Sequence, residues 1–181
     1  MIYNKNWTLF LDRDGVLNED NPGDYVKDLD KYRIMPGVKE AMKKLSGIFG
    51  TIVVCTNQRG VSKGVFTIET MHAMNNILLK EIKNSGGRID KIYYAIDLED
   101  NAPNRKPNPG MALQAKQDFP QIDFSKSIMV GNNISDMQFA RNAGINTTIF
   151  LTTTNDVTLP HPLIDAKFDS LKSFADNIDL L

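Results

Sequence analysis

The sequence predicts an α/β fold in which a mostly parallel sheet is covered by helices on both faces. Short apolar runs rich in β-branched and aromatic residues alternate along the chain with segments whose apolar residues have helical spacing. This alternation is typical of parallel sheets. We find no repeats, low-complexity tracts or linkers in the 181 residues, so we expect one domain spanning residues 1–181.

Each expected element follows from a local pattern. Strands are expected at residues 8–11, 51–55, 92–96, 127–130 and 147–150. Helices are expected at residues 36–48, 67–84, 109–119, 134–142 and 170–178. Pro36 and Pro109 each begin a helical segment, where proline is well tolerated. After Leu151 we expect only an edge connection and the last helix.

Two connections are long, residues 18–35 and 97–108. Both begin just after the carboxyl end of an expected strand, which is the edge where open α/β sheets bind ligands. Loops of this length in a compact domain are usually functional or mobile. We therefore expect both to border a binding site.

Composition limits the classes of function. The net charge of −1 gives no large positive field for nucleic acid or anionic membranes, and no apolar run is long enough to cross a bilayer. Cys55 is the only cysteine, which excludes an intramolecular disulfide and a cysteine cluster for zinc. We expect a cytoplasmic protein that binds neither nucleic acid nor membrane. We also expect structural roles for Cys55, His72 and His161.

The stretch LFLDRDGVLNED, residues 9–20, places two carboxylates directly after the first expected strand. Asp12 and Asp14 point to the same side of an extended chain, and Gly15 then permits a sharp turn. Like charges this close raise one pKa or recruit a cation such as Mg²⁺. One carboxylate could then be a nucleophile and the other a proton shuttle. The alternative is a solvated turn in which the aspartates only cap backbone groups.

The stretch VVCTNQRGVSKG, residues 53–64, brings polar residues to the end of the second strand. Thr56 and Asn57 offer a hydroxyl and an amide, and Arg59 and Lys63 add positive charge within a glycine-bearing loop. This combination suits a phosphate. The alternative is a helix-entry loop with exposed basic residues.

Two further stretches follow later strands. NRKPNPG, residues 104–110, places Arg105 and Lys106 before a helix, where they could bind phosphate oxygens or remain a solvated pair. MVGNNISDM, residues 129–137, places Asn132 and Asp136 at the same edge, where they could complete an oxygen cage or cap the following helix. All four stretches place polar or charged side chains after an expected strand, and their occurrence together favours a functional site.

These stretches resemble the motifs of the haloacid dehalogenase superfamily of phosphotransferases. The family has a DxDG nucleophile loop, a Ser/Thr after the second strand, a lysine, and an acidic pair after the fourth strand. FLDRDGVLNED, VVCTNQRGVSKG, RKPNPGM and MVGNNISDMQFARNAGI are similar to the branch that holds D-glycero-D-manno-heptose 1,7-bisphosphate phosphatases and histidinol-phosphate phosphatases. The resemblance covers residues 8–150 and implies a three-layer α/β/α Rossmann-like core.

The resemblance implies a role for each matching position. Asp12 would form an aspartyl-phosphate, Asp14 would act as acid and then as base, and Thr56 and Lys106 would hold the phosphoryl oxygens. Mg²⁺ would be bound by Asp12, Asp14 through its backbone carbonyl, Asn132 and Asp136. The implied substrate-binding residues are Arg13, Asp20, Gly23, Tyr25, Asn57, Gln58, Arg59, Lys63 and Arg105. The implied substrate is a small phosphorylated sugar, with heptose 1,7-bisphosphate first and histidinol phosphate second, and we expect a monomer.

The sequence departs from the family pattern in two places. The branch often carries a zinc loop of three cysteines and one histidine, but residues 93–110 contain neither residue, so we expect no zinc. Asn132 stands where the family most often has a metal-binding aspartate; its amide oxygen can still bind magnesium, but one negative charge is lost. Asp136 could then coordinate the ion directly. The 41 residues at positions 15–55 are too few for a separate cap domain.

Other functions remain open at this point. A receiver-type signalling domain also has an acidic pocket, a Thr and a Lys on an α/β sheet, but it carries adjacent acids after the first strand. A catalytically weak binding or scaffold protein is suggested by Asn132. A nucleic-acid 3′-phosphatase is disfavoured by the net charge of −1.

Overall fold

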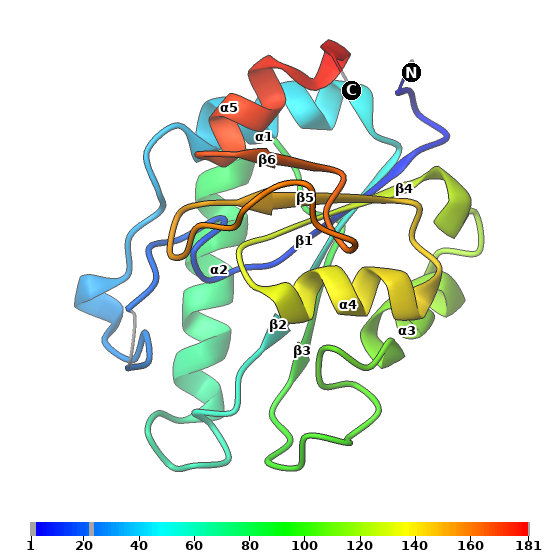
Figure 1. Ribbon diagram of the computed structural model, residues 1–181. Coiled ribbons are helices and arrows are strands. Elements are labelled where there is room, and N and C mark those ends of the chain that lie inside the picture. Colours follow the sequence, from blue (N-terminus) through cyan, green and yellow to red (C-terminus); the bar gives the residue numbers. More distant parts are fainter. Residues whose placement is uncertain (1–2, 22–23, 181) are drawn as a thin grey trace.

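The computed structural model describes residues 3–21 and 24–180. Their strands form one sheet in the order β3-β2-β1-β4-β5-β6 (Figure 1). The strands are β1 (Thr8–Leu11), β2 (Thr51–Asn57), β3 (Lys91–Ala95), β4 (Ser127–Gly131), β5 (Thr147–Leu151) and β6 (Ala166–Phe168). Every neighbouring pair is parallel, which confirms the predicted α/β class.

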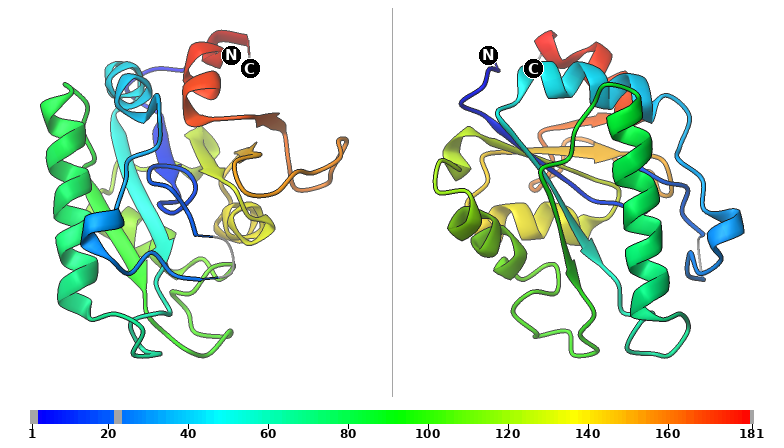
Figure 2. Two further views of the ribbon diagram at one scale, coloured as in Figure 1. Left: turned by 90° about the vertical axis from the view of Figure 1, so that its left-hand side faces the viewer. Right: turned by 180° about the vertical axis from the view of Figure 1, so that it is seen from behind.

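Helices cover both faces of the sheet (Figure 2). One layer contains α1 (Val38–Ile48), α2 (Ile68–Asn84) and α5 (Leu171–Asp176), and the other contains α3 (Gly110–Asp118) and α4 (Ile134–Ala143). Three short 3-10 turns complete the elements: η1 (Leu29–Lys31), η2 (Phe124–Lys126) and η3 (Ile178–Leu180). Side chains cap the N-termini of α2 and α5. Thr67 Oγ1 accepts a hydrogen bond from the backbone of Thr70, and Ser170 Oγ accepts one from the backbone of Ser173.

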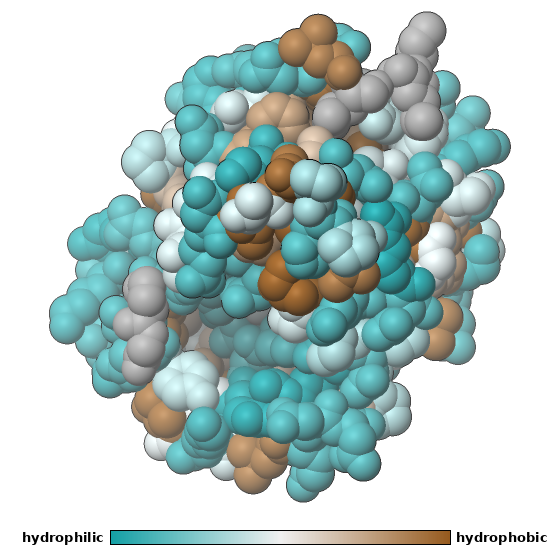
Figure 3. Space-filling model, in the orientation of Figure 1, coloured by the Kyte–Doolittle hydropathy of each residue, from teal (hydrophilic) through white to brown (hydrophobic). Residues whose placement is uncertain are grey.

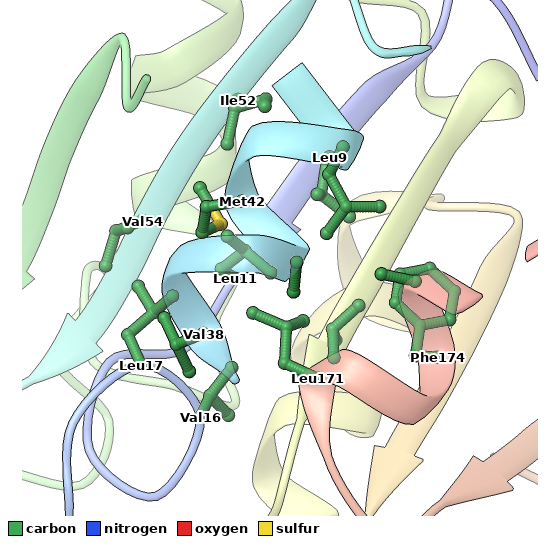
Figure 4. Close-up of a cluster of buried hydrophobic side chains, with 14 of the residues drawn as sticks. Leu9, Leu11, Val16, Leu17, Val38, Met42, Ile52, Val54, Leu171 and Phe174 are labelled. Atoms are coloured by element: carbon green, nitrogen blue, oxygen red, sulfur yellow. The ribbon is translucent and has the colours of Figure 1, made fainter. Parts of the chain in front are cut away.

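The strand side chains alternate between the two layers, as expected for a sheet that is buried on both faces. Leu9 and Leu11 pack with Met42 of α1 and Phe174 of α5 (Figure 4), whereas Phe10 faces the layer of α3 and α4. All five side chains are fully buried. Burial of an aliphatic or aromatic side chain of this size stabilises the fold by about 1.5–3 kcal/mol. The two apolar layers therefore make the sheet a rigid support for the loops at its edge.

Two details of the sheet differ from the sequence-based expectation. β2 continues to Asn57, so Thr56 belongs to the strand and not to the loop after it. A sixth strand, β6, pairs with β5 where only an edge connection was expected. This expectation was wrong because β6 has three residues and no buried alternation to mark it.

Within the described residues of the connection from β1 to α1, the 3-10 turn η1 is the one regular element. Among the residues it describes, the structure thus shows no α-helix or sheet inserted in that connection. In the described part of the chain, no helix has both the length and the apolar character needed to cross a membrane.

Candidate active site

The strand order places a switch point between β1 and β4. The chain runs from β1 to β2 on one side and returns to β4 on the other, so the carboxyl ends of β1 and β4 border a crevice. A cavity of about 210 Å³ lies there. Figure 3, drawn in the orientation of Figure 1, shows a hydrophilic hollow on the lower half of the molecular surface that faces the viewer. The predicted site residues that line the cavity are Asp12, Asp14, Asp20, Tyr25, Thr56, Asn57, Gln58, Lys106 and Asp136.

Asp12, Lys106 and Asp136 form a buried ionic cluster. Lys106 Nζ lies 2.8 Å from Asp12 Oδ1 and 2.6 Å from Asp136 Oδ1, and the three residues are only 1–8% exposed. Burial raises the pKa of Asp12 to about 7, with a further contribution from the charge of Asp136, while Lys106 opposes the rise. Burial alone would lower the pKa of Lys106, but the two carboxylates outweigh it and raise this pKa. The cluster holds two carboxylates and one ammonium group, so one further positive charge would fit it.

Asp14 has a different set of partners. Its Oδ1 accepts hydrogen bonds from Arg13 Nε (3.1 Å), Arg13 Nη2 (3.0 Å) and Asn18 Nδ2 (2.9 Å). Its Oδ2 accepts one from Gln58 Nε2 at 2.7 Å. Burial alone would raise the pKa of Asp14, but Arg13, and then Asn18 and Gln58, outweigh it and lower this pKa. Asp14 is therefore held ionised and in one orientation.

The end of β2 connects these two groups. Gln58 Nε2 also donates to Thr56 Oγ1 at 2.9 Å, so the threonine hydroxyl lies beside Asp14. Asn57 exchanges two hydrogen bonds with the backbone of Lys106, at 3.1 and 3.0 Å. Asn57 thus fastens the loop that carries Lys106 to β2, and this fixes where the ammonium group lies.

The donors available to a metal ion are mixed. Among the described residues, no group of three or more His, Cys, Asp or Glu side chains is arranged to hold a metal. Asn132 is fully buried, however, and its Oδ1 has no hydrogen-bond partner in the described part of the chain. An unpartnered buried carbonyl oxygen calls for a ligand, and Mg²⁺ binds amide, carboxylate and backbone oxygens. The donor set of Asp12, Asn132 and the backbone carbonyl of Asp14 therefore fits magnesium.

Asp136 differs from its expected role as a direct metal ligand. Its Oδ1 is engaged by Lys106, and its Oδ2 accepts backbone hydrogen bonds from Asn132 (3.2 Å) and Asn133 (3.0 Å). Both oxygens are thus used to hold Lys106 and the start of α4. The structure fits Asp136 better as a support for the cluster than as a metal ligand.

Several predicted substrate contacts lie away from the cavity lining. Arg13 is fully buried, and its Nη1 donates to Asn75 Oδ1 at 3.0 Å, so it lies outside the cavity lining and its contact with substrate stays a prediction. Arg59 and Arg105 both pair with the exposed Asp100, and Lys63 is exposed, with its Nζ 5.7 Å from the ring centroid of Tyr25. Long side chains turn to whichever acid or ring is near, and the sequence did not show these partners. Gly23 lies outside the described residues.

The structure also adds residues that the sequence reading missed. Asp24, Val26, Phe66, Asn133 and Ser135 line the cavity. The rings of Tyr25 and Phe66 lie 6.1 Å apart and give it an aromatic wall. These residues lie in or beside the loops after β1, β2 and β4, so their position after strand ends was the signal available. No sequence signal marked Asn18 or Asn75, which support Asp14 and Arg13.

Comparisons with known proteins show which family the chain resembles. The family model described as haloacid dehalogenase-like hydrolase matches residues 3–144. A D-glycero-alpha-D-manno-heptose-1,7-bisphosphate 7-phosphatase from Campylobacter jejuni is 36% identical, with 81% of this chain and 83% of that protein covered. A D-glycero-beta-D-manno-heptose-1,7-bisphosphate 7-phosphatase from Helicobacter pylori is 32% identical, with 98% and 99% covered.

A solved structure is similar over nearly its whole length. The D,D-heptose 1,7-bisphosphate phosphatase from B. bronchiseptica, complexed with magnesium and phosphate, has a TM-score of 0.82 and 25% identity, with 96% of this chain and 98% of that chain covered. The fold, the convergence of the four sequence motifs on one cavity and the family match lead to one conclusion. The chain belongs to the haloacid dehalogenase-like hydrolases.

Proposed function

We propose that the protein is a magnesium-dependent phosphatase that removes the 7-phosphate of D-glycero-D-manno-heptose 1,7-bisphosphate. The observation that carries the proposal is the pairing of Asp12 with Lys106 at the base of a polar cavity. The names of the relatives from Campylobacter jejuni and Helicobacter pylori support the choice of substrate. The magnesium and phosphate bound by the similar solved structure support the choice of cofactor.

Asp12 is suited to attack phosphorus. Its Oδ1 accepts hydrogen bonds from the backbone of Arg13 (2.7 Å) and from Lys106, and no hydrogen bond among the described residues reaches Oδ2. In the first step Oδ2 bonds to phosphorus, and the bond from phosphorus to the sugar oxygen breaks. The sugar oxygen takes the electron pair of that bond and a proton from Asp14. Lys106 and Thr56 stabilise the charge on the phosphoryl oxygens.

In the second step water attacks the phosphorus of the aspartyl-phosphate, the bond from phosphorus to Asp12 Oδ2 breaks, and Asp14 takes a proton from that water. The hydrogen bonds to Asp14 favour its ionised form, which suits this base role directly. The acid role in the first step requires Asp14 to bind a proton as the substrate enters. Magnesium held by Asp12, Asn132 and the backbone carbonyl of Asp14 would supply positive charge for the phosphoryl oxygens.

A screen of phosphorylated metabolites tests this proposal. Both anomers of heptose 1,7-bisphosphate, histidinol phosphate and fructose 1,6-bisphosphate are compared by phosphate release with and without Mg²⁺. We expect the highest kcat/KM with one heptose anomer, and a product that keeps its C1 phosphate by ³¹P NMR. A preference for histidinol phosphate would overturn the substrate assignment. A stable phosphoprotein without turnover would instead indicate a receiver-type domain, and absence of magnesium-dependent hydrolysis would indicate a binding protein.

We also propose a monomer located in the cytoplasm. Sedimentation of the purified protein at several concentrations checks the oligomeric state.

A further inference from the structure

The loop after β5 reaches back to the buried amide of Asn132. Thr154 Oγ1 accepts a hydrogen bond from Asn132 Nδ2 at 2.8 Å, and it donates a longer one to Asp20 Oδ2 at 3.4 Å. The adjacent Thr153 Oγ1 donates to the backbone carbonyl of Gly15 at 2.5 Å. Two consecutive hydroxyls thus tie this loop to the segment that contains Asp12 and Asp14.

Packing alone cannot decide which way the Asn132 amide faces. The space around it is tight: Gly15 has φ of +76°, and a Cβ atom there would lie 2.1 Å from Asn132 Nδ2. The nitrogen and oxygen of an amide have nearly the same size, so a half-turn about the last side-chain bond exchanges them without a change in shape. A hydrogen-bond partner must therefore select the orientation.

Thr154 is the partner that makes this selection. Its hydroxyl hydrogen is directed to the carboxylate of Asp20, so its oxygen is left to accept a hydrogen bond. Only the nitrogen of the amide can donate that bond. The amide oxygen is then turned the other way, and this is the Oδ1 that has no partner among the described residues.

We propose that Thr154 is a positioning residue that orients the Asn132 amide so that its oxygen faces the magnesium ion. The inference rests on the magnesium site of the proposed function. It explains how a neutral side chain can serve at a position where the family pattern has a carboxylate. An aspartate has two equivalent oxygens and needs no such selection, whereas an asparagine presents an N–H₂ group to the cation when it is turned the wrong way.

Calorimetric titration with Mg²⁺, without substrate, tests the proposal on Thr154→Val, which keeps the shape of the side chain and removes the hydroxyl. We expect its affinity for Mg²⁺ to fall by about 10- to 100-fold, as is typical when a residue that orients a metal ligand is lost. Thr154→Ser keeps the hydroxyl and should bind Mg²⁺ within about 2-fold of the wild type. Thr152→Val is the matched control, since Thr152 lies in the same loop but its hydroxyl donates to Phe168. Thr154→Ala replaces Thr154→Val if the latter does not fold.

The same change in an Asn132→Asp background separates orientation from general damage. With two equivalent carboxylate oxygens at position 132, Thr154→Val should alter Mg²⁺ affinity by no more than about 2-fold. Unchanged affinity in Thr154→Val, an equal loss in both backgrounds, or a loss in Thr154→Ser as large as in Thr154→Val would each overturn the inference. A wild-type protein that binds no Mg²⁺ would overturn the magnesium site of the proposed function as well.

Discussion

Asp12 and Asp14 are two residues apart, and both are largely buried, yet their surroundings have opposite effects. Asp12 shares the single cation Lys106 with Asp136, and the pKa of Asp12 rises to about 7. Asp14 is the one carboxylate paired with the guanidinium of Arg13 among the described residues, it accepts amide donors from two other residues, and the pKa of Asp14 falls. Burial raises the pKa of both carboxylates, so the opposite outcomes come from their different partners.

This difference suits two different tasks. The Asp12 cluster has more negative than positive charge, which a bound cation would balance, and it leaves one carboxylate oxygen without a hydrogen bond among the described residues. The Asp14 cluster is balanced without a metal and is held in place by Arg13, which is itself held by Asn75. Four predictions test whether this division of labour is real.

The largest effect is expected for Asp12→Asn. An amide cannot form the aspartyl-phosphate, so kcat should fall by about 10⁴-fold or more, as is seen when a nucleophile is removed from other enzymes. Phosphate release from heptose 1,7-bisphosphate measures this. The circular dichroism spectrum should be unchanged, because no apolar contact of the core is altered. An undiminished rate would remove Asp12 as the nucleophile.

A smaller loss is expected for Asp14→Asn, and it should depend on the leaving group. Loss of proton transfer should reduce kcat on a sugar phosphate by about 10²- to 10⁴-fold. The loss should be smaller with p-nitrophenyl phosphate, whose leaving group needs no proton. The measurement is the ratio of kcat on the two substrates in the wild type and the variant. Equal losses on both would contradict a role in proton transfer.

A smaller effect than that of Asp14→Asn is expected for Arg13→Lys. This change keeps the positive charge but loses the two-pronged contact with Asp14. We expect kcat to fall by about 10-fold while KM changes little, because Arg13 does not reach the cavity. Steady-state kinetics on the sugar phosphate check this split. Arg88→Lys is the matched control, since Arg88 makes comparable hydrogen bonds to Ser46, Phe49 and Gly50. A rise in KM without a fall in kcat would return Arg13 to substrate binding.

The last prediction concerns the stability of the metal-free protein. The pKa of Asp12 is about 7 in the folded protein and near 3.8 when unfolded, so the folded state binds the extra proton between these values. Its contribution to the free energy of unfolding therefore falls as pH rises from about 4 to 7 and is constant above that. Asp12→Asn lacks this decline. The Tm of the variant minus the Tm of the wild type should therefore increase between pH 5 and about pH 7 and then stay constant up to pH 8. Thermal unfolding in EDTA checks this, and a Tm difference independent of pH would contradict it.

Much of this arrangement could be predicted from the sequence because it depends on local signals. The alternation of strands and helices gave the fold class, and parallel strands bring their carboxyl ends to one edge. Asp12, Thr56 and Lys106 were therefore expected near one another, and the structure brings them together. The catalytic roles assigned to them stay predictions. β6 was missed because three residues carry too little periodicity.

The orientation of long or polar side chains could not be predicted in the same way. Arg13 turns inward to Asn75, which is 62 positions away, and Arg59 turns to Asp100, which is 41 positions away. Such pairings depend on which elements become neighbours in three dimensions. The amide of Asn132 is the clearest case, because its orientation depends on Thr154, which lies in a stretch that no sequence pattern marked.

The environment of Cys55 has a practical consequence. The side chain is buried beneath α3 and α4, and burial raises the pKa of its thiol to about 12. Maleimides and other alkylating reagents need an accessible thiolate, so the natural chain should remain unlabelled. A fluorophore or spin label could then be attached through a cysteine introduced at an exposed loop position such as Asp100, with no need to replace the native residue. The loop between β3 and α3 is thus open to distance measurements during turnover.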